Sequence, residues 1–124
     1  MTTSKARVLL ADDDAGLRRL MVTTLGRDRF DLLEAVDGPE ALRVAQEQAP
    51  DLLLLDVNMP GLDGYEVCRR LKATPQTASI KVVILTGRGS DADRAQAQDV
   101  GADAYFSKPF SPVQLLDRVY ALLG

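Results

Sequence analysis

A run of four leucines that ends on an aspartate, Leu52–Asp56, constrains the fold of this chain more than any other segment. A short continuous apolar run closed by turn-forming residues, here residues 57–61, is typical of a β-strand that is buried on both faces. An ionised carboxylate is costly to bury and is rarely left without a partner. The sequence therefore predicts that Asp56 lies at the edge of a polar site, where a buried strand ends.

Strand-like and helix-like segments alternate along the chain. We predict strands at residues 7–11, 30–35, 52–56, 80–86 and 104–107, and helices at residues 15–27, 39–49, 65–73, 91–100 and from 112 onward. Such an alternation predicts a parallel sheet with helices on both faces, and residues 1–124 are expected to form one domain. The last helix is expected to bury five apolar side chains, those of Leu115, Leu116, Val119, Leu122 and Leu123.

The composition argues against several classes of protein and site. The net charge of -3 argues against direct binding of nucleic acid, and no apolar segment reaches the roughly 18 residues that span a membrane. The chain has no histidine, which excludes Ser-His-Asp and Cys-His catalytic arrangements. Cys68 is the single cysteine and cannot form an internal disulfide, and the polar N-terminus lacks the apolar core of a signal peptide. We therefore expect a cytoplasmic protein.

Polar side chains gather at the predicted carboxyl ends of the strands, where open parallel sheets hold their functional crevice. In chain order these residues are Asp12, Asp13, Asp56, Thr86 and Lys108. The second predicted strand contributes none, as expected for a strand at the edge of the sheet. Since four distant segments supply these side chains, their convergence at one edge predicts a functional site.

The charges at this edge predict a divalent cation. Two carboxylates about 4 Å apart repel each other by roughly 4 kcal/mol at an intermediate dielectric. Three acids and one lysine leave a local charge of minus two, three negative charges against one positive. Without histidine any metal must be held by oxygens, and Mg²⁺ prefers carboxylates, water and phosphate. We therefore expect Asp12, Asp13 and Asp56 to hold Mg²⁺. A carboxylate in that setting is equipped to accept a phosphoryl group.

Each of these residues also has a plain structural interpretation. The acids at residues 12–14 could cap the first helix, Lys108 could be a solvated surface residue, and Thr86 could be an ordinary strand residue. Their joint placement at neighbouring strand ends favours the functional interpretation, while Asp14 itself is interpreted as the helix cap.

Four short segments at or beside the predicted strand ends carry a family resemblance. They are residues 8–14 (Val-Leu-Leu-Ala-Asp-Asp-Asp), 56–64 (Asp-Val-Asn-Met-Pro-Gly-Leu-Asp-Gly), 85–87 (Leu-Thr-Gly) and 101–110 (Gly-Ala-Asp-Ala-Tyr-Phe-Ser-Lys-Pro-Phe). Together they resemble the receiver domain of two-component response regulators, over essentially the whole chain. The resemblance implies a flavodoxin-like α/β fold, with a five-stranded parallel sheet of order 2-1-3-4-5 sandwiched by five helices. Because no effector domain follows, the chain looks like a stand-alone, chemotaxis-regulator-like receiver.

The resemblance implies roles for the acidic residues and their neighbours. Asp56 is implied as the phosphoacceptor and as a ligand of Mg²⁺. Asp12 and Asp13 are implied as the acidic pair that holds the ion, and Asn58 as a ligand through its backbone carbonyl. Arg88 and Asn58 are expected near the entrance of the site, where they set how fast water reaches the aspartyl phosphate.

The resemblance also implies the parts of a switch. Lys108 is implied to pair with Asp56 and later with the phosphoryl group, and its peptide bond to Pro109 is implied to be cis. Thr86 is implied as the switch hydroxyl that moves to bond the phosphoryl group. Tyr105 is implied as the aromatic side chain whose rotamer turns inward after phosphorylation.

The implied partners are proteins. The phosphodonor would be a sensor histidine kinase or a histidine phosphotransfer protein. Phosphorylation would shift the population of conformers at the face formed by the fourth helix, the fifth strand and the fifth helix, where an unknown downstream protein docks. The chain would be a signalling switch, not an enzyme beyond its own phosphoryl transfer and dephosphorylation, and would act as a monomer or weak dimer.

Three other functions match parts of the pattern. A phosphatase of the haloacid-dehalogenase type also uses a strand-end aspartate, but needs a second aspartate two residues later, where this chain has Asn58. A flavodoxin needs a phosphate-cradling loop after the first strand, where Asp12 and its acidic neighbours repel phosphate. A degenerate receiver that only binds proteins is disfavoured, because all the residues implied in phosphorylation are present.

Overall fold

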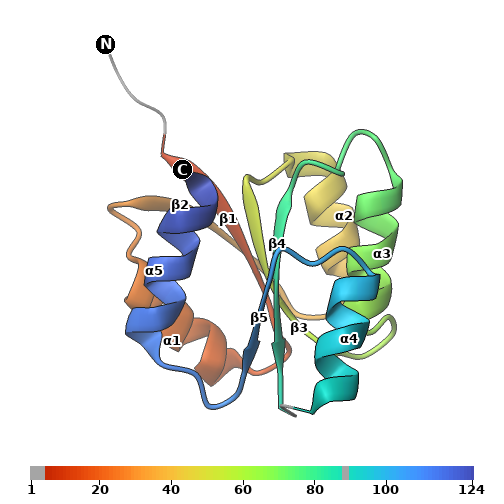
Figure 1. The fold of residues 1–124 in the computed structure, drawn as a ribbon. Coiled ribbons are helices and arrows are strands. Elements are labelled where there is room, and N and C mark those ends of the chain that lie inside the picture. Colours follow the sequence, from red (N-terminus) through yellow and green to blue (C-terminus); the bar gives the residue numbers. More distant parts are fainter. Residues whose placement is uncertain (1–4, 88–89) are drawn as a thin grey trace.

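Strands and helices alternate through the computed structural model, which describes residues 5–87 and 90–124 (Figure 1). Arg88 lies outside these described residues. The strands are β1 (Ala6–Ala11), β2 (Phe30–Ala35), β3 (Leu52–Asp56), β4 (Lys81–Thr86) and β5 (Ala104–Ser107). The helices are α1 (Ala15–Leu25), α2 (Gly38–Gln48), α3 (Gly64–Ala73), α4 (Asp91–Asp99) and α5 (Pro112–Leu123).

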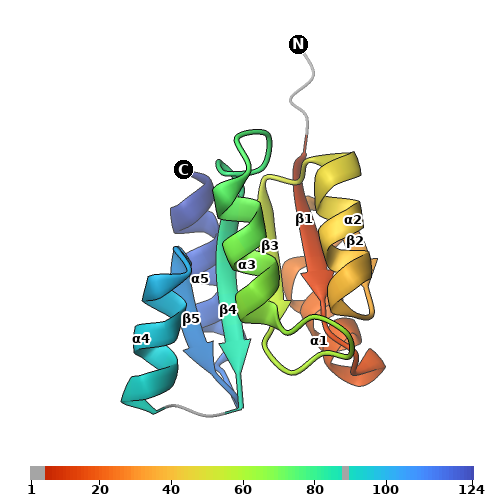
Figure 2. The ribbon, with the colours of Figure 1, turned by 90° about the vertical axis from the view of Figure 1, so that its right-hand side faces the viewer.

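The five strands form one parallel sheet in the order β2-β1-β3-β4-β5. Helices α1 and α5 cover one face of the sheet, and α2, α3 and α4 cover the other, which faces the viewer in Figure 2. This arrangement confirms the flavodoxin-like fold, with β2 at one edge. All strands point the same way, so their carboxyl ends meet along one side of the molecule.

Strand β3 lies in the middle of the sheet, and its leucines pack in both directions. Leu53 and Leu55 belong to the core on the side of α2, α3 and α4. Leu52 and Leu54 belong to the core on the side of α1 and α5. All four are fully buried, and burying one leucine stabilises a fold by about 1.5–3 kcal/mol. Two cores therefore explain a continuous apolar run in place of an alternating one.

Each helix begins at a residue whose side chain accepts backbone N–H groups of the first turn. These residues are Asp14, Asp37, Asp63, Ser90 and Ser111. Helix α1 ends two residues before the predicted position, because Gly26 leaves the helical conformation with a φ of 88° while its N–H still donates to Val22. Within residues 5–87 and 90–124, no helix has the length and apolar character needed to cross a membrane.

Helix α5 is less buried than its sequence predicts. Leu115 and Val119 are fully buried, as expected for two residues four apart on one helix face. Leu116, Leu122 and Leu123 are only partly buried, so the prediction is wrong for them. The helix contacts the sheet along a narrow stripe, and these three side chains lie at its margins.

Candidate functional site

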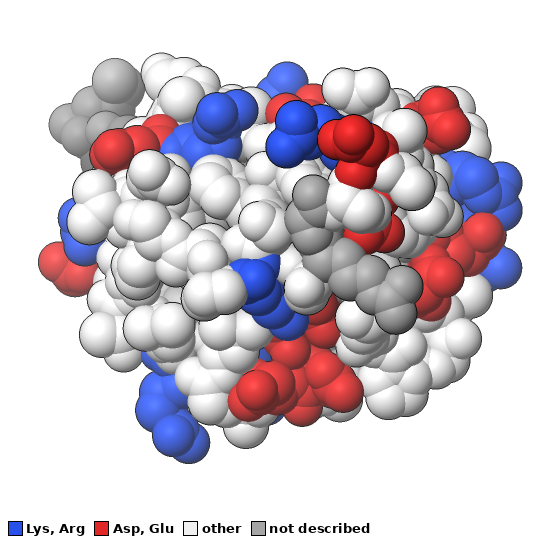
Figure 3. All heavy atoms as spheres, turned by 60° about the horizontal axis from the view of Figure 1, so that its bottom comes forward, with Lys and Arg blue, Asp and Glu red and all other residues white. Residues whose placement is uncertain are grey.

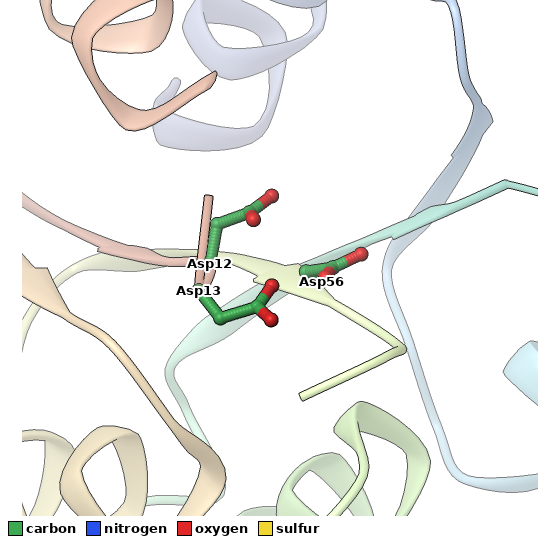
Figure 4. A group of neighbouring side chains, drawn as sticks. All are labelled: Asp12, Asp13 and Asp56. Atoms are coloured by element: carbon green, nitrogen blue, oxygen red, sulfur yellow. The ribbon is translucent and has the colours of Figure 1, made fainter. Parts of the chain in front are cut away.

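The three predicted acids meet at the carboxyl ends of β1 and β3. Ala11 and Leu55 are partners in the parallel register, so the residues that follow them, Asp12 and Asp56, lie side by side. Asp12 is fully buried and Asp56 is 3% exposed, whereas Asp13 is exposed. One carboxylate oxygen from each of the three lies within 4.8 Å of the others (Figure 4). The structure thus brings together all three residues that the sequence places there.

Lys108 is the cation that faces these acids. Its Nζ donates to Oδ1 of Asp56 at 2.8 Å and to Oδ2 of Asp12 at 3.3 Å. Burial alone lowers the pKa of the ammonium group, but the hydrogen bond to Asp56 and the charge of Asp12 outweigh it, so the pKa is raised. The backbone N–H of Lys108 donates to the carbonyl of Thr86 at 2.6 Å, and the Lys108–Pro109 peptide bond is cis. Lys108 is therefore fixed to the end of β4.

Asp12 is in an unfavourable position for a charge. Burial raises the pKa of its carboxyl group, and the negative charge of Asp56 raises it further. A hydrogen bond from the N–H of Asp14 to Oδ1, at 2.9 Å, and the neighbouring Lys108 lower the pKa but do not offset the increase. The site therefore has more negative charge than its lysine balances.

The donor set fits a hard divalent cation. Acidic side chains gather on the face onto which the strand ends open, with basic side chains beside them (Figure 3). Among the described residues, Asp12, Asp13 and Asp56 form the group that could hold a metal ion. Mg²⁺ takes oxygen ligands and combines one or two carboxylates with water and phosphate oxygens. Carboxylates at this spacing, one of them exposed, match that preference.

The other predicted site residues lie around this group. Thr86 ends β4, is 2% exposed, and follows directly after the register partner of Asp56. Asn58 lies in the loop after β3, with an exposed side chain. Tyr105 lies on β5, half-buried, with the guanidinium carbon of Arg94 6.0 Å from the centre of its ring. Thr86 is thus next to the acids, whereas Tyr105 lies on the far side of β4, beside α4.

Two residues shape the site although the motifs do not assign them a role. A Cβ atom at Gly64 would lie 2.4 Å from the carbonyl oxygen of Asp56, so only glycine lets α3 begin so close to β3. Nη1 of Arg18, on α1, donates to the carbonyl of Asp12 at 2.7 Å. A glycine directly after a helix cap is a sequence signal for the close approach of Gly64 to Asp56. An arginine beside the apolar stripe of α1 is a weaker signal for the bond from Arg18 to Asp12.

Tyr65 connects α3 to α4. Its hydroxyl donates to the backbone carbonyl of Asp93 at 3.3 Å and lies 3.4 Å from Oδ1 of the same residue. Burial and the charge of Asp93 raise the pKa of Tyr65 to about 12. The helix that begins next to Asp56 therefore also holds the first turn of α4.

Comparisons with known proteins agree with this geometry. The model of the response regulator receiver domain matches residues 8–120. The transcriptional regulatory protein ResD of Bacillus subtilis is 43% identical over 124 residues, covering 98% of this chain and 49% of ResD. The chain spans half the length, or less, of the curated relatives it matches, so its action as a stand-alone receiver stays a prediction.

Solved structures show the same fold over their whole length. A response regulator from Chloroflexus aurantiacus superposes with a TM-score of 0.91 at 32% identity, covering 97% of this chain and 98% of that one. The chemotaxis response regulator CheY4 of Vibrio cholerae has a TM-score of 0.88 at 31% identity, covering 96% and 99%. The fold, the acidic cluster and the family match agree, and the chain belongs to the response regulator receiver domains of two-component systems, a family of signalling switches.

Proposed function

We propose that Asp56 accepts a phosphoryl group from the phosphohistidine of a sensor histidine kinase or a histidine phosphotransfer protein. The observation that carries this proposal is the setting of the Asp56 carboxylate. It is almost fully buried at a strand end, bonds to Lys108 at 2.8 Å, and lies beside Asp12 and Asp13. A purely structural ion pair gains nothing from two further carboxylates, whereas a phosphoryl-transfer site needs them to bind a cation.

The proposed step is an in-line displacement at phosphorus. One oxygen of Asp56 forms a bond to phosphorus while the bond from phosphorus to the donor imidazole breaks. The imidazole nitrogen keeps the electron pair of that bond and takes up a proton. Lys108, which already bonds Asp56 and Asp12, is placed to donate a hydrogen bond to the transferred group.

A cation would complete the charge balance of this site. When bound, Mg²⁺ offsets the negative charge of the carboxylates and of the phosphoryl oxygens. Asp12, Asp13 and Asp56 would hold it through carboxylate oxygens, and Asn58 through its backbone carbonyl. These ligands come from the segment directly after β1, the last residue of β3 and the loop after β3, so binding would also tie two strand ends together.

The proposed output is a change at the face formed by α4, β5 and α5. Thr86 would bond the phosphoryl group and draw the end of β4 towards Asp56. Tyr105 would then turn inward from its half-buried position beside Arg94. A downstream protein would read the changed surface. The support for this route is the placement of Thr86 and Tyr105 on adjacent strands, between the acids and α4.

Intact-mass measurement with acetyl phosphate and Mg²⁺ tests the proposal. The wild type should gain one phosphoryl group in a magnesium-dependent manner, and Asp56→Asn should gain none. Asp63→Asn is the matched control, because it makes the same chemical change at an aspartate that caps the nearby helix α3, and asparagine also caps helices. No gain in the wild type would contradict phosphorylation, and many turnovers of the donor without an aspartyl phosphate would favour an enzyme.

A further inference from the structure

We propose that Arg18 is a positioning residue for the metal-binding acids, a role that rests on the proposed Mg²⁺ site. Nη1 of Arg18 donates to the backbone carbonyl of Asp12 at 2.7 Å, and the arginine side chain is only 15% exposed. The contact is made to the main chain of Asp12 and not to its carboxylate. Arg18 therefore acts on where the acid is held and not on its charge.

The edge strand β2 anchors this contact. The N–H of Asp12 donates to the carbonyl of Ala35 at 3.1 Å, which fixes one side of the residue to β2. Nε of Arg18 donates to Oε1 of Glu34 at 3.1 Å, so the carbonyl of Asp12 is also fixed to β2, through the guanidinium group. Glu34 in turn pairs with Arg27 at 3.4 Å. Strand β2 supplies no side chain to the acidic cluster, yet it holds Asp12 from both sides.

The held carbonyl belongs to the peptide unit between Asp12 and Asp13. Its orientation sets the direction in which the exposed Asp13 side chain leaves the backbone. At Asp12, Oδ1 accepts the N–H of Asp14, and Oδ2 faces Lys108. A rotation of this peptide unit would move both acids relative to Asp56, and metal affinity depends strongly on such outer contacts.

Charge and positioning predict opposite effects when Arg18 is replaced. Removing a positive charge near the site should by itself favour a divalent cation. Removing a group that orients the ligands should disfavour it, typically by 10–100-fold in affinity. Arg19 provides a matched control, because it is the next residue of the same helix, carries the same charge and is exposed.

Calorimetric titration with Mg²⁺ of the wild type, Arg18→Met, Arg18→Lys and Arg19→Met tests the inference. Arg18→Met should bind Mg²⁺ about tenfold more weakly or worse. Arg18→Lys keeps the charge but lacks the planar fork that reaches Asp12 and Glu34 together, so it should lose affinity by a smaller factor. Arg19→Met should bind as tightly as the wild type or slightly more tightly. Unfolding in EDTA identifies any variant that is not folded.

The outcomes separate this inference from the proposed function. Wild-type or tighter Mg²⁺ binding by Arg18→Met would overturn the positioning role while leaving the metal site in place. If Arg18→Met does not fold, wild-type or tighter Mg²⁺ binding by Arg18→Lys would overturn the positioning role. An equal loss in Arg19→Met would also overturn it, since that residue makes no contact with Asp12 in the described hydrogen bonds. No Mg²⁺ binding by the wild type would instead refute the metal site itself.

Discussion

Each end of the sheet has a lysine that pairs with aspartate. The charge of one lysine is balanced by a single aspartate, whereas the other lysine pairs with two. At the amino ends of the strands, Nζ of Lys72 donates to Asp103 at 2.9 Å and to the carbonyl of Ile80 at 2.7 Å. The same carboxylate oxygen of Asp103 accepts the N–H of Val82 at 2.8 Å. One cation thus meets one anion, and backbone groups supply the remaining hydrogen bonds.

At the carboxyl ends of the strands the ratio of positive to negative side chains is different. In the part of the chain that the structure describes, Lys108 pairs with both Asp12 and Asp56, and Asp13 adds a third carboxylate with an oxygen within 4.8 Å of an oxygen of each. The two ends therefore differ in how many carboxylates share one lysine. A balanced pair stabilises the fold, and an unbalanced cluster leaves a requirement that a ligand can meet.

Replacing the balanced lysine should have the largest effect on stability. Lys72→Met leaves the Asp103 carboxylate without its cation, which should lower the free energy of unfolding by about 2–3 kcal/mol. Phosphorylation by acetyl phosphate should be unchanged, because Lys72 lies at the other end of the sheet. Denaturant unfolding and intact mass measure the two quantities, with Lys81→Met as an exposed control. A variant that keeps its stability but loses phosphorylation would contradict the comparison.

Replacing the unbalanced lysine should affect stability less and function more. Lys108→Met should lower the free energy of unfolding by about 1–2 kcal/mol without metal, because Asp12 and Asp56 lose the cation with which both pair. Mg²⁺ should restore part of this loss. The change in the amide NMR signals of α4 and β5 after phosphorylation should be lost, since Lys108 no longer bonds the phosphoryl group. The comparison would be contradicted if the amide signals of α4 and β5 still changed as in the wild type after phosphorylation. It would also be contradicted if Lys108→Met in Mg²⁺ had a free energy of unfolding as low as that of Lys72→Met.

Removing one acid should have the smallest effect, and with the opposite sign. Asp12→Asn should raise the free energy of unfolding by about 1 kcal/mol at neutral pH without metal, because it relieves repulsion. The pKa of Asp12 is raised in the folded state, so its contribution to stability is favourable below its ordinary pKa and is lost as pH rises through the folded value. The gain from Asp12→Asn should therefore grow between acidic and neutral pH.

Urea unfolding of both proteins in EDTA, across that pH range, measures this difference. Subtracting the two curves removes the contributions of the acids that do not interact with Asp12, because the two proteins share them. A difference that does not change with pH would show that the ionised Asp12 costs the fold nothing. Stabilisation by Mg²⁺ should also be smaller in the variant, because one metal ligand has lost its charge.

The sheet and the acids could be predicted because they depend on local sequence and on topology. Short apolar runs identify the strands, and parallel strands place their carboxyl ends at one edge of the sheet. The strand order that the family resemblance implies then makes Asp12 and Asp56 neighbours. The same reasoning identifies β2 as an edge strand. It does not reveal that Ala35 and Glu34 of β2 hold the main chain beside the site.

Contacts that depend on how the helices are docked could not be predicted. The bond from Arg18 to Asp12 and the bond from Tyr65 to Asp93 both join side chains of helices to other segments. Helical periodicity shows which face of a helix is apolar, but not how far that face extends over the sheet. For the same reason the sequence predicts equal burial for Leu115 and Leu116, although of the two only Leu115 is fully buried.

The four leucines of β3 have a consequence for how the strand finds its place. Identical residues do not specify the register of a strand, because a shift of β3 by one position along β1 would still fill both cores with leucine. The aspartates at the two ends of the run specify it. Asp51 accepts the N–H of Arg7 at 2.8 Å, and Asp56 accepts Lys108 at the same distance. The leucines supply the free energy of burial. The proposed phosphoacceptor Asp56, together with Asp51, fixes the register of β3 in the sheet.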